Sequence, residues 1–483
     1  MTMISKSPAL AKMFISLIFL SSYTFAFADG PFDPTFAGSG LFPYAYWFRD
    51  SLAEASGIAR DSHGRLLVAT SVTSTDKDGL AATRHIAVDG EALIPELTDG
   101  VPDKAFGTNG IASDFFGPDN FSYATAIAVD HHDRVLVGGT VGGTVHCPDG
   151  TTKYVVTDGL VRLRNDKDFD GQADLTFGTF GAAIYGDCSN ATWGIASMAV
   201  DSNDSVVTTG TVYKDSRYEA SVVRWTSDGQ LDGGFGDAGA ASAAFMGNDT
   251  FGTAIAIDSL GRILVVARAS TDDGVVGLLT RFTPDGKRDT TFGSGGYAQL
   301  GTLEPRDIVI IGTNSFDSPN VCCVKIDSRN RLLVAGTAFT PSMGSSETLE
   351  QSAFVARFKD DGKPDETFGL HGFVYPSANQ LTGADALAID NKDRPVVGGY
   401  VRSPYFPSEV TVLTHFNLDG SLNKAVGFGG VYTAAFGFSG SYITSLLIDG
   451  AGRPTLTASG DDSDSTQVPV LIRYDELFGD GFD

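Results

Sequence analysis

Cysteine and positive charge are both scarce in this 483-residue chain. It has four cysteines, and 34 Lys and Arg residues against 59 Asp and Glu residues leave a formal charge of −25. Nucleic acids and anionic membrane surfaces attract proteins through basic patches. The charge therefore argues against both as partners and favours cations or neutral polymers.

Long apolar runs are missing beyond the first residues. Lys6 and Lys12 precede the apolar run 13–20, and Ala26-Phe-Ala28 follows it, which is the layout of a secretory signal peptide. No later stretch reaches the roughly 18 apolar residues that a membrane helix needs. We predict a signal peptide at 1–28, no transmembrane segment, and an exported protein of charge −27 in the periplasm, at the cell surface or outside the cell.

Linear catalytic motifs are absent as well. The chain contains no Gly-x-Ser-x-Gly elbow, Gly-x-Gly-x-x-Gly fingerprint, phosphate loop, His-Glu-x-x-His pair or sialidase-type Asp box, each of which marks a known chemistry. Seven histidines are scattered, and His131 and His132 are expected to be solvated in a turn. Sites assembled from distant loops leave no such motif, so the absences argue against an enzyme without excluding one.

What the chain does have is a repeat with a period of about 65 residues. Its first motif is an apolar pair, an Asp, a short polar turn, a basic residue and another apolar run, as in Ile255 to Val265. The Asp of this motif recurs at 61, 130, 201, 258, 327, 390 and 449. Because an Asp side chain accepts hydrogen bonds from turn amides, we interpret this Asp as structural, not as part of a metal or acid-base ring.

The second motif is Asp-x-x-Phe-Gly-x-x-Gly. Clear copies begin at Asp103, Asp174, Asp232, Asp289 and Asp365; degenerate copies begin at Asp33 and Asn423, and a truncated copy at Asp475 closes the chain. We expect its Phe to fill the gap between units and its Gly residues to supply positive φ.

Each unit is predicted to form four short strands, of which the first follows the last Gly of the second motif. Apolar runs such as 262–267 indicate strands that are covered on both faces. A four-stranded sheet cannot bury both faces alone, so the units must pack on one another. We predict one domain at 29–483, an all-β, seven-bladed β-propeller of four-stranded antiparallel blades, with the start of the chain beside the end of the seventh blade.

The combination of the two motifs, as in Asp361 to Gly372 and Val324 to Gly336, resembles the delta-60 repeat of exported bacterial proteins, which is similar to NHL-type propeller repeats. The resemblance covers residues 31–483. It implies a propeller fold, and it implies little about activity because no general catalytic residue set belongs to that repeat.

The loops are expected to divide between two faces. One face carries the short Asp turns and the Phe-Gly links. The other collects the irregular segments 71–80, 140–156, 297–321, 337–352 and 400–409, with the aromatics Tyr154, Phe316, Tyr405 and Phe406. Variable loops on a rigid scaffold are where binding usually occurs, so we expect the ligand there.

Export allows disulfides. Cys147 and Cys188 fall in irregular loops of adjacent units on the same face, and we predict a bridge between them, the alternative being two free thiols. Cys322 and Cys323 open a strand. A vicinal bridge is one reading, but the favoured one is a pair of buried free cysteines.

An insertion in the second unit gives a candidate calcium loop. Asp166, Asp168, Asp170, Gln172 and Asp174 supply oxygens at positions one, three, five, seven (through its backbone carbonyl) and nine, with Gly171 at six. This follows the calcium-loop pattern and resembles the calcium hairpins of FG-GAP propellers in spacing. Position twelve is Phe177 where an EF-hand needs Glu, so the alternative is a solvated acidic turn.

From these observations we expect a secreted or surface monomer that acts as a non-catalytic binding module for a protein or glycan, with calcium as a candidate stabilising ion. The alternative is an extracellular propeller hydrolase or lyase with acid-base carboxylates at the channel mouth. Carboxylates or histidines that converge in a central pocket favour the enzyme; an aromatic loop surface favours binding.

Overall fold

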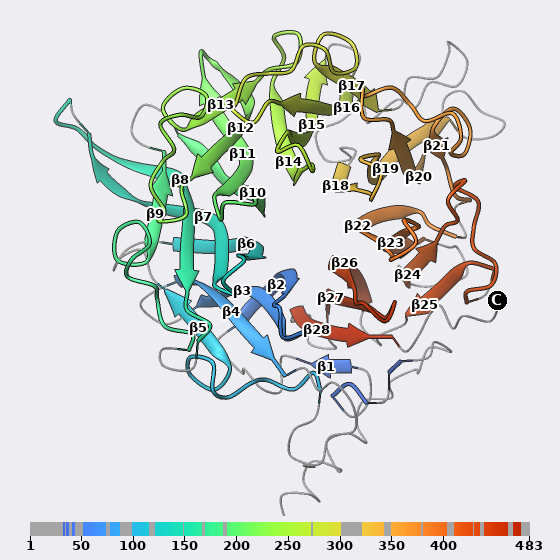
Figure 1. The fold of residues 1–483 in the computed structure, drawn as a ribbon, viewed down its shortest axis with the longest axis horizontal. Coiled ribbons are helices and arrows are strands. Elements are labelled where there is room, and N and C mark those ends of the chain that lie inside the picture. Colours follow the sequence, from blue (N-terminus) through green and yellow to red (C-terminus); the bar gives the residue numbers. More distant parts are fainter. Residues whose placement is uncertain are drawn as a thin grey trace, which may run out of the picture.

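The computed structural model shows seven four-stranded antiparallel sheets arranged around an axis (Figure 1). This confirms the predicted seven-bladed propeller. The structure describes residues 32–33, 35–37, 41–43, 52–73, 78–86, 99–114, 121–147, 149–166, 170–186, 191–271, 274–300, 321–341, 349–377, 380–402, 410–427, 429–434, 439–461 and 467–474. Within these ranges no helix is long and apolar enough to span a membrane. The predicted signal peptide lies outside them.

The strands of the first four blades, from the axis outward, are β2 (Leu52–Arg60), β3 (Leu66–Thr73), β4 (Asp78–His85), β5 (Ile111–Asp114); β6 (Phe121–Val129), β7 (Val135–His146), β8 (Thr152–Leu163), β9 (Ala182–Tyr185); β10 (Thr192–Val200), β11 (Val206–Lys214), β12 (Arg217–Trp225), β13 (Ala240–Ala243); β14 (Thr250–Ile257), β15 (Ile263–Thr271), β16 (Gly274–Phe282) and β17 (Tyr297–Leu300). Those of the last three are β18 (Val321–Ile326), β19 (Leu332–Pro341), β20 (Leu349–Phe358), β21 (Phe373–Val374); β22 (Gly383–Ile389), β23 (Pro395–Val401), β24 (Val410–His415), β25 (Val431–Ala434); β26 (Ser439–Ile448), β27 (Pro454–Asp461), β28 (Gln467–Arg473) and β1 (Leu41–Pro43).

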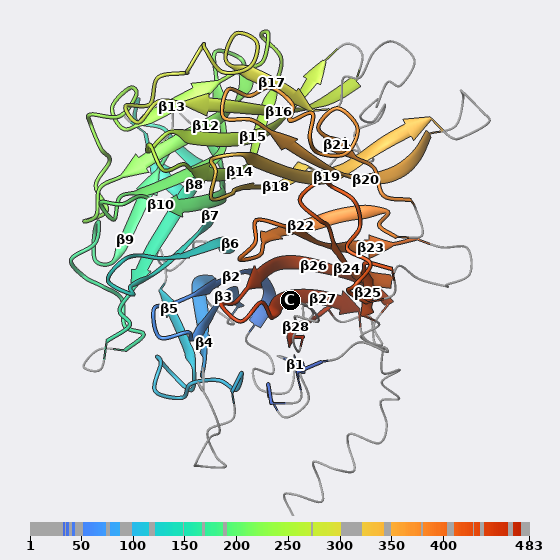
Figure 2. The ribbon, with the colours of Figure 1, turned by 45° about the vertical axis from the view of Figure 1, so that its right-hand side comes forward.

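The ring closes as predicted, by pairing the two ends of the chain. Strand β1 pairs with β28 in register from Leu41 with Ile472 to Pro43 with Val470. Figure 2 shows β1 beside β28 next to the C-terminal blade. This pairing covers an outer strand edge that would otherwise be open.

The predicted position of one strand within the unit is wrong. The short strand after the last Gly of the second motif is the outermost strand of the blade before it, as β21 shows by pairing with β20. The Phe-Gly turn folds straight back onto its own sheet, since the Arg357 amide donates to the Gly372 carbonyl and the Asp365 amide to the Arg357 carbonyl, both at 2.8 Å. The irregular link follows this strand. The division of loops between the two faces is unaffected.

The hydrophobic core lies between the blades, not inside them. In the described part of the chain it consists of seven clusters, one at each blade interface. The cluster between the third and fourth blades, for example, packs Val207 and Phe235 against Ile255 and Phe282. Sheets covered on both faces carry nearly continuous apolar runs, which explains the unbroken burial from Ile263 to Ala267 in β15.

An arginine stands at six of the seven blade interfaces; five of the six are buried, and Arg224 is half-buried. Each lies on the third strand of a blade, pairs with the Asp of the Phe-Gly motif, and stacks on the Phe of the same motif with the guanidinium 4.5–4.7 Å from the ring centre. These joints are Arg84/Asp103/Phe106, Arg162/Asp174/Phe177, Arg224/Asp232/Phe235, Arg281/Asp289/Phe292, Arg357/Asp365/Phe368 and Arg473/Asp33/Phe36.

The fifth blade shows how such a joint reaches its neighbour. Arg357 is 1% exposed, and its Nε lies 2.8 Å from Oδ2 of Asp365. Its Nη1 donates to the Leu418 carbonyl of the sixth blade. The Gly369 amide donates to the Asp419 carbonyl at 2.7 Å. Gly369 has φ of +56°, and a Cβ there would lie 2.1 Å from the Phe373 carbonyl oxygen, so only glycine fits.

The sixth blade replaces all three joint residues together. His415 stands for Arg, Asn423 for Asp and Val426 for Phe, with His415 Nδ1 3.0 Å from Asn423 Nδ2. Burial lowers the pKa of His415, against the opposing effect of Asp390. The sixth blade thus has a neutral pair where the other blades have a charged one. Changing only one partner would leave the other as a buried charge without a counter-charge, so both are replaced together.

We predict that the joint tolerates paired changes better than single ones. Arg357→His leaves the Asp365 carboxylate buried without its guanidinium and should cost about 3–5 kcal/mol, whereas Arg357→His with Asp365→Asn recreates the neutral pair and should recover part of that loss. Thermal melting of both variants measures the effect. Lys363→Ala, in an exposed ion pair with Asp361, is the control and should change stability by less than about 1 kcal/mol. Additive losses in the double variant would contradict the coupling.

Candidate functional site

The innermost strands of all seven blades line a central channel with a cavity of about 230 Å³. Each of these strands is interrupted at the same repeat position by a bulge, which leaves one residue out of the pairing. The bulge residues, all in the cavity wall, are Ser56, Thr125, Ala196, Thr253, Cys322, Asp385 and Thr444. The bulges therefore give the channel a ring of small or polar side chains.

Two ionisable residues lie in the described wall of this cavity, Asp385 on β22 and Lys325 on β18. The repeat position of Lys325 is alanine in five of the other six blades. Lys325 is open to solvent within the channel, yet protein surrounds it, and the resulting desolvation lowers its pKa. For an enzyme we expected several carboxylates or histidines to converge in this cavity. The described wall contains one carboxylate and one amine.

The same wall contains a vicinal disulfide. Cys322 and Cys323 are bonded to each other with an S–S distance of 2.06 Å and Cα atoms 3.7 Å apart, so the favoured reading of two free thiols is wrong. The bulge of β18 lies between Val321 and Cys323, which places the bridge at the bulge. Of the other predicted bridge, Cys147 is buried and disulfide-bonded, and Cys188 lies outside the described residues. The Cys147–Cys188 pairing stays a prediction.

Exposed aromatic side chains gather on the variable face, where the inner strands begin. Trp193 is 57% exposed and lies 4.9 Å from Tyr218 and 5.9 Å from Phe251 between ring centres. Tyr218 also contacts Tyr213 at 5.1 Å and Phe251 at 5.4 Å. Trp193 and Phe251 precede the channel residues Ala196 and Thr253 by only two or three positions. The cluster therefore flanks the channel mouth.

A second aromatic pair lies on the same face, on the second blade. Phe121 is 41% and Tyr154 59% exposed, and both pack over Gly142, where a Cβ would lie within 2.6 Å of each side chain. The β7–β8 hairpin that carries Tyr154 projects beyond the ring (Figure 1). We call the six residues Phe121, Tyr154, Trp193, Tyr213, Tyr218 and Phe251 the aromatic surface. Tyr154 was predicted on this face, and Phe316, Tyr405 and Phe406 lie outside the described residues.

A buried carboxyl lies on the second blade near the strand that carries Trp193. Asp158 on β8 is 1% exposed, neither of its carboxyl oxygens has a hydrogen-bond partner among the described residues, and burial raises its pKa to about 7, against the opposing effect of Thr192 and Gly194 on either side of Trp193. Asp158 is thus largely neutral below pH 7. A protonated carboxyl is the form that tolerates burial.

This burial predicts a pH-dependent stability. The pKa of Asp158 is higher in the folded state than in the unfolded state, so the folded state loses stability as the pH rises. The loss begins near pH 4, where the unfolded carboxyl ionises, and ends near pH 7, the folded pKa. It amounts to at most about 4 kcal/mol. Asp158→Asn keeps the shape without the charge. Its melting temperature should exceed that of the unmodified chain at pH 8 and match it near pH 4. A difference independent of pH would contradict the assignment.

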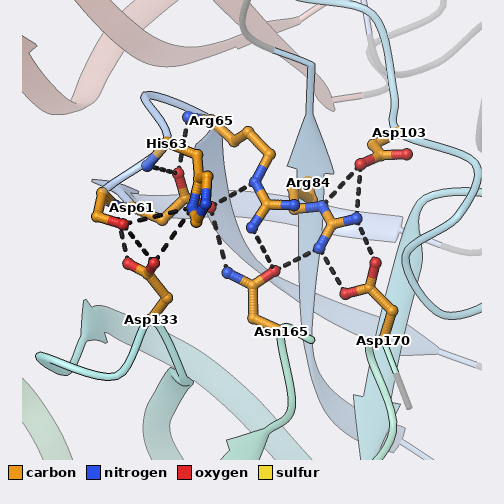
Figure 3. Close-up of polar contacts among 9 residues, drawn as sticks. Asp61, His63, Arg65, Arg84, Asp103, Asp133, Asn165 and Asp170 are labelled. Atoms are coloured by element: carbon orange, nitrogen blue, oxygen red, sulfur yellow. Dashed lines mark hydrogen bonds and ion pairs between the residues drawn. The ribbon is translucent and has the colours of Figure 1, made fainter. Parts of the chain in front are cut away.

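Of the predicted calcium residues, Asp170 lies at the joint between the first two blades (Figure 3), and Asp174 lies at the joint between the second and third. Asp170 forms a bidentate pair with Arg84 at 2.5 Å, Asp174 pairs with Arg162 at 2.9 Å, and Asp166 with Arg164 at 2.7 Å. Asn165 bridges the same joint, since it accepts from Arg65 at 3.1 Å and donates to Asp61 at 3.2 Å.

Arg84 Nη1 thus donates to the side chains of Asn165 and Asp170, whereas at four other joints the arginine Nη1 donates to a backbone carbonyl of the next blade. Gln172 is exposed, and its carbonyl accepts from the Arg164 amide. Asp168 lies outside the described residues. A bound Ca²⁺ has to compete with Arg84 for Asp170 and with Arg162 for Asp174. The calcium site stays a prediction.

The repeated Asp of the turns has the structural role expected of it. Asp258 is typical: its Oδ1 accepts from the Leu260 and Arg262 amides at 2.9 Å, and its Oδ2 accepts from Arg262 Nε at 2.6 Å. These oxygens are engaged within their own turn, as an Asx-type turn requires.

Sequence reasoning missed Trp193, Tyr218 and Phe251 because it searched the irregular loops, and these residues lie within regular strands. The available signal was their position. Trp193 and Phe251 each stand directly before a glycine and two or three residues before a channel position of the repeat, where an apolar core side chain is not required.

No family model and no curated protein matches the chain. Among solved structures it is similar to polysaccharide lyase Uly1, with a TM-score of 0.44 and 8% identity over 88% of this chain and 90% of that one. It is also similar to an endo-arabinase from Bacteroides thetaiotaomicron, with a TM-score of 0.29 and 12% identity over 57% and 91% of the two chains. An α-L-arabinanase from Penicillium chrysogenum gives a TM-score of 0.31 and 10% identity over 73% and 93%. These names agree with the alternative prediction, a propeller hydrolase or lyase, better than with a non-catalytic module, but likenesses this distant carry no argument about activity.

Proposed function

We propose that the protein is an exported propeller that binds a neutral polysaccharide across the aromatic surface at the channel mouth. The observation that carries this proposal is the contiguous, partly exposed cluster of Trp193, Tyr218 and Phe251. Exposed aromatic clusters are uncommon on monomers and mark interaction sites. Tyr and Trp in particular are enriched at binding interfaces, because each has an apolar ring and a polar group that can make a hydrogen bond.

The shape and charge of the surface favour a sugar polymer. Aromatic faces carry the negative side of the ring quadrupole, which attracts the partly positive C–H groups on one face of a sugar ring. The aromatic surface runs across the second, third and fourth blades, so an extended chain can contact several rings at once. The formal charge of −25 disfavours polyanions, so the neutral polymers are the better candidates.

Loss of the central ring should weaken binding to polysaccharide. In affinity electrophoresis through gels containing arabinan or a neutral glucan, the unmodified chain should be retarded, and Trp193→Ala should reduce the affinity by about tenfold, the loss typical of a central aromatic contact. Phe180→Ala is the matched control, because Phe180 is 79% exposed in a Phe-Gly link on the opposite face, and it should change nothing. Equal retardation of all three chains would refute the proposed surface.

A second candidate function is cleavage of the same polymer within the channel. The observation that favours it is the placement of Asp385 and Lys325 in the channel wall. A carboxyl group and an amine of lowered pKa are both suited to proton transfer. In this second candidate function the aromatic surface binds the polysaccharide, and Asp385 transfers the proton in the cleavage step.

Cleavage predicts the release of reducing ends from arabinan or glucan by the unmodified chain and its loss in Asp385→Asn. Asp237→Asn, an exposed carboxylate in a Phe-Gly link on the far face, is the control and should keep full activity. Retardation in the gel without any release of reducing ends would leave the binding function and eliminate the catalytic one.

A further inference from the structure

Two adjacent imidazoles meet one carboxylate at the joint between the second and third blades, on the face of the Asp turns. His131 and His132 lie in the β6–β7 turn, and Asp204 lies in the β10–β11 turn of the next blade. Nδ1 of His131 is 2.7 Å from Oδ1 of Asp204, and Nδ1 of His132 is 2.6 Å from Oδ2. The two imidazole nitrogens therefore converge on the same pair of oxygens.

At two corresponding joints a single serine makes the contact to the aspartate of the next blade. Between the fifth and sixth blades, Ser328 donates its amide to Asp393 Oδ1 at 3.0 Å and its hydroxyl to Oδ2 at 2.5 Å. The joint between the first two blades has the same serine contact, from Ser62 to Asp133 (Figure 3). The His131 amide makes this contact to Asp204 at 2.9 Å. The two imidazoles are thus additional to what holds the blades together.

We propose that His131, His132 and Asp204 form a binding site for a divalent transition-metal ion, with Zn²⁺ as the best-suited class. Imidazole nitrogen and carboxylate oxygen are the ligands that Zn²⁺ takes in open sites, where three protein groups leave a fourth position for water. The donor set distinguishes this site from the calcium loop, because Ca²⁺ takes oxygen ligands only.

The surroundings permit an ion to enter. The His131 and His132 side chains are 63% and 70% exposed, whereas the Asp204 side chain is 9% exposed, so the carboxylate is fixed and the imidazoles can move. Tetrahedral bonds of about 2.0–2.1 Å separate neighbouring ligand atoms by roughly 3.4 Å. The His132 and Asp204 donor atoms already lie within 4.8 Å of each other, so the exposed His131 imidazole is the group that must turn toward His132 for an ion to bind.

Two further groups border the site. Asp130 contributes a carboxylate oxygen within 4.8 Å of the His132 and Asp204 donor atoms, but it already accepts from Arg134 Nε at 2.6 Å and from two amides of its own turn. Arg134 Nη2 lies 4.0 Å from Asp204. Asp130 therefore balances the arginine charge beside the ion, and the three proposed ligands hold it.

The test is titration of the mature, metal-stripped chain with ZnCl₂, followed by calorimetry and by thermal melting. We expect one Zn²⁺ per chain, a rise in melting temperature, and no competition from CaCl₂. His131→Ala and His132→Ala should each weaken binding at least about tenfold, since loss of a ligand costs no less than loss of an outer-shell partner. Both side chains are exposed, so neither variant should misfold.

His63→Ala is the matched control. His63 occupies the same turn position as His132 one blade earlier, and its Nδ1 lies 3.2 Å from Asp133, but Ser62 stands beside it in place of a second histidine. Its removal should leave Zn²⁺ binding unchanged. Absence of binding at millimolar Zn²⁺, binding that is equal in both histidine variants and the unmodified chain, or displacement of Zn²⁺ by Ca²⁺ would overturn the proposal.

Discussion

The arginine present at six of the seven blade joints is the contact on which the ring depends. A propeller blade cannot shield its own faces, so its stability comes from the neighbour, and the neighbour has to be held at a fixed angle. Arg281, for example, pairs with Asp289, stacks on Phe292 and donates to the Asp360 carbonyl of the next blade. One side chain thus connects its own sheet to the turn that follows the third strand of the next blade, beside the hydrophobic cluster that each interface buries.

Closure uses the same device with residues from opposite ends of the chain. Asp33 and Phe36, from the N-terminal copy of the Phe-Gly motif, complete the joint of Arg473 on β28. The departures from the pattern are equally informative. The second blade offers Arg84 the side chains of Asn165 and Asp170, where four other joints offer the arginine a backbone carbonyl. The sixth blade changes Arg, Asp and Phe together. The features that we propose as functional lie apart from these joint contacts. The aromatic surface and the channel wall are on strand positions, and the imidazole pair is in a turn.

The sequence predicted the number of blades and the closure because each blade leaves its own copy of two motifs. It could not predict which strand begins the blade, because a repeat reads the same from any starting point. The hydrogen bonds of Arg357 with Gly372 and Asp365 show that the strand after the Phe-Gly motif ends its own blade. It gave Arg357 no role, because the contact that joins the blades is made to a residue 61 positions away. The bond between Cys322 and Cys323 and the packing of Trp193 on Tyr218 depend likewise on geometry that residue order does not contain.

The central claim is that these joints hold the ring as one unit. The amides of Gly178, Gly236, Gly293 and Gly369 each donate to a carbonyl of the next blade at 2.6–2.9 Å, so they report directly on the joints. Native-state hydrogen exchange at these four glycines is the most direct measurement. The account predicts that all four exchange slowly and at a common rate set by global unfolding; exchange as fast as that of exposed turn amides, or widely different rates among the four, would contradict it.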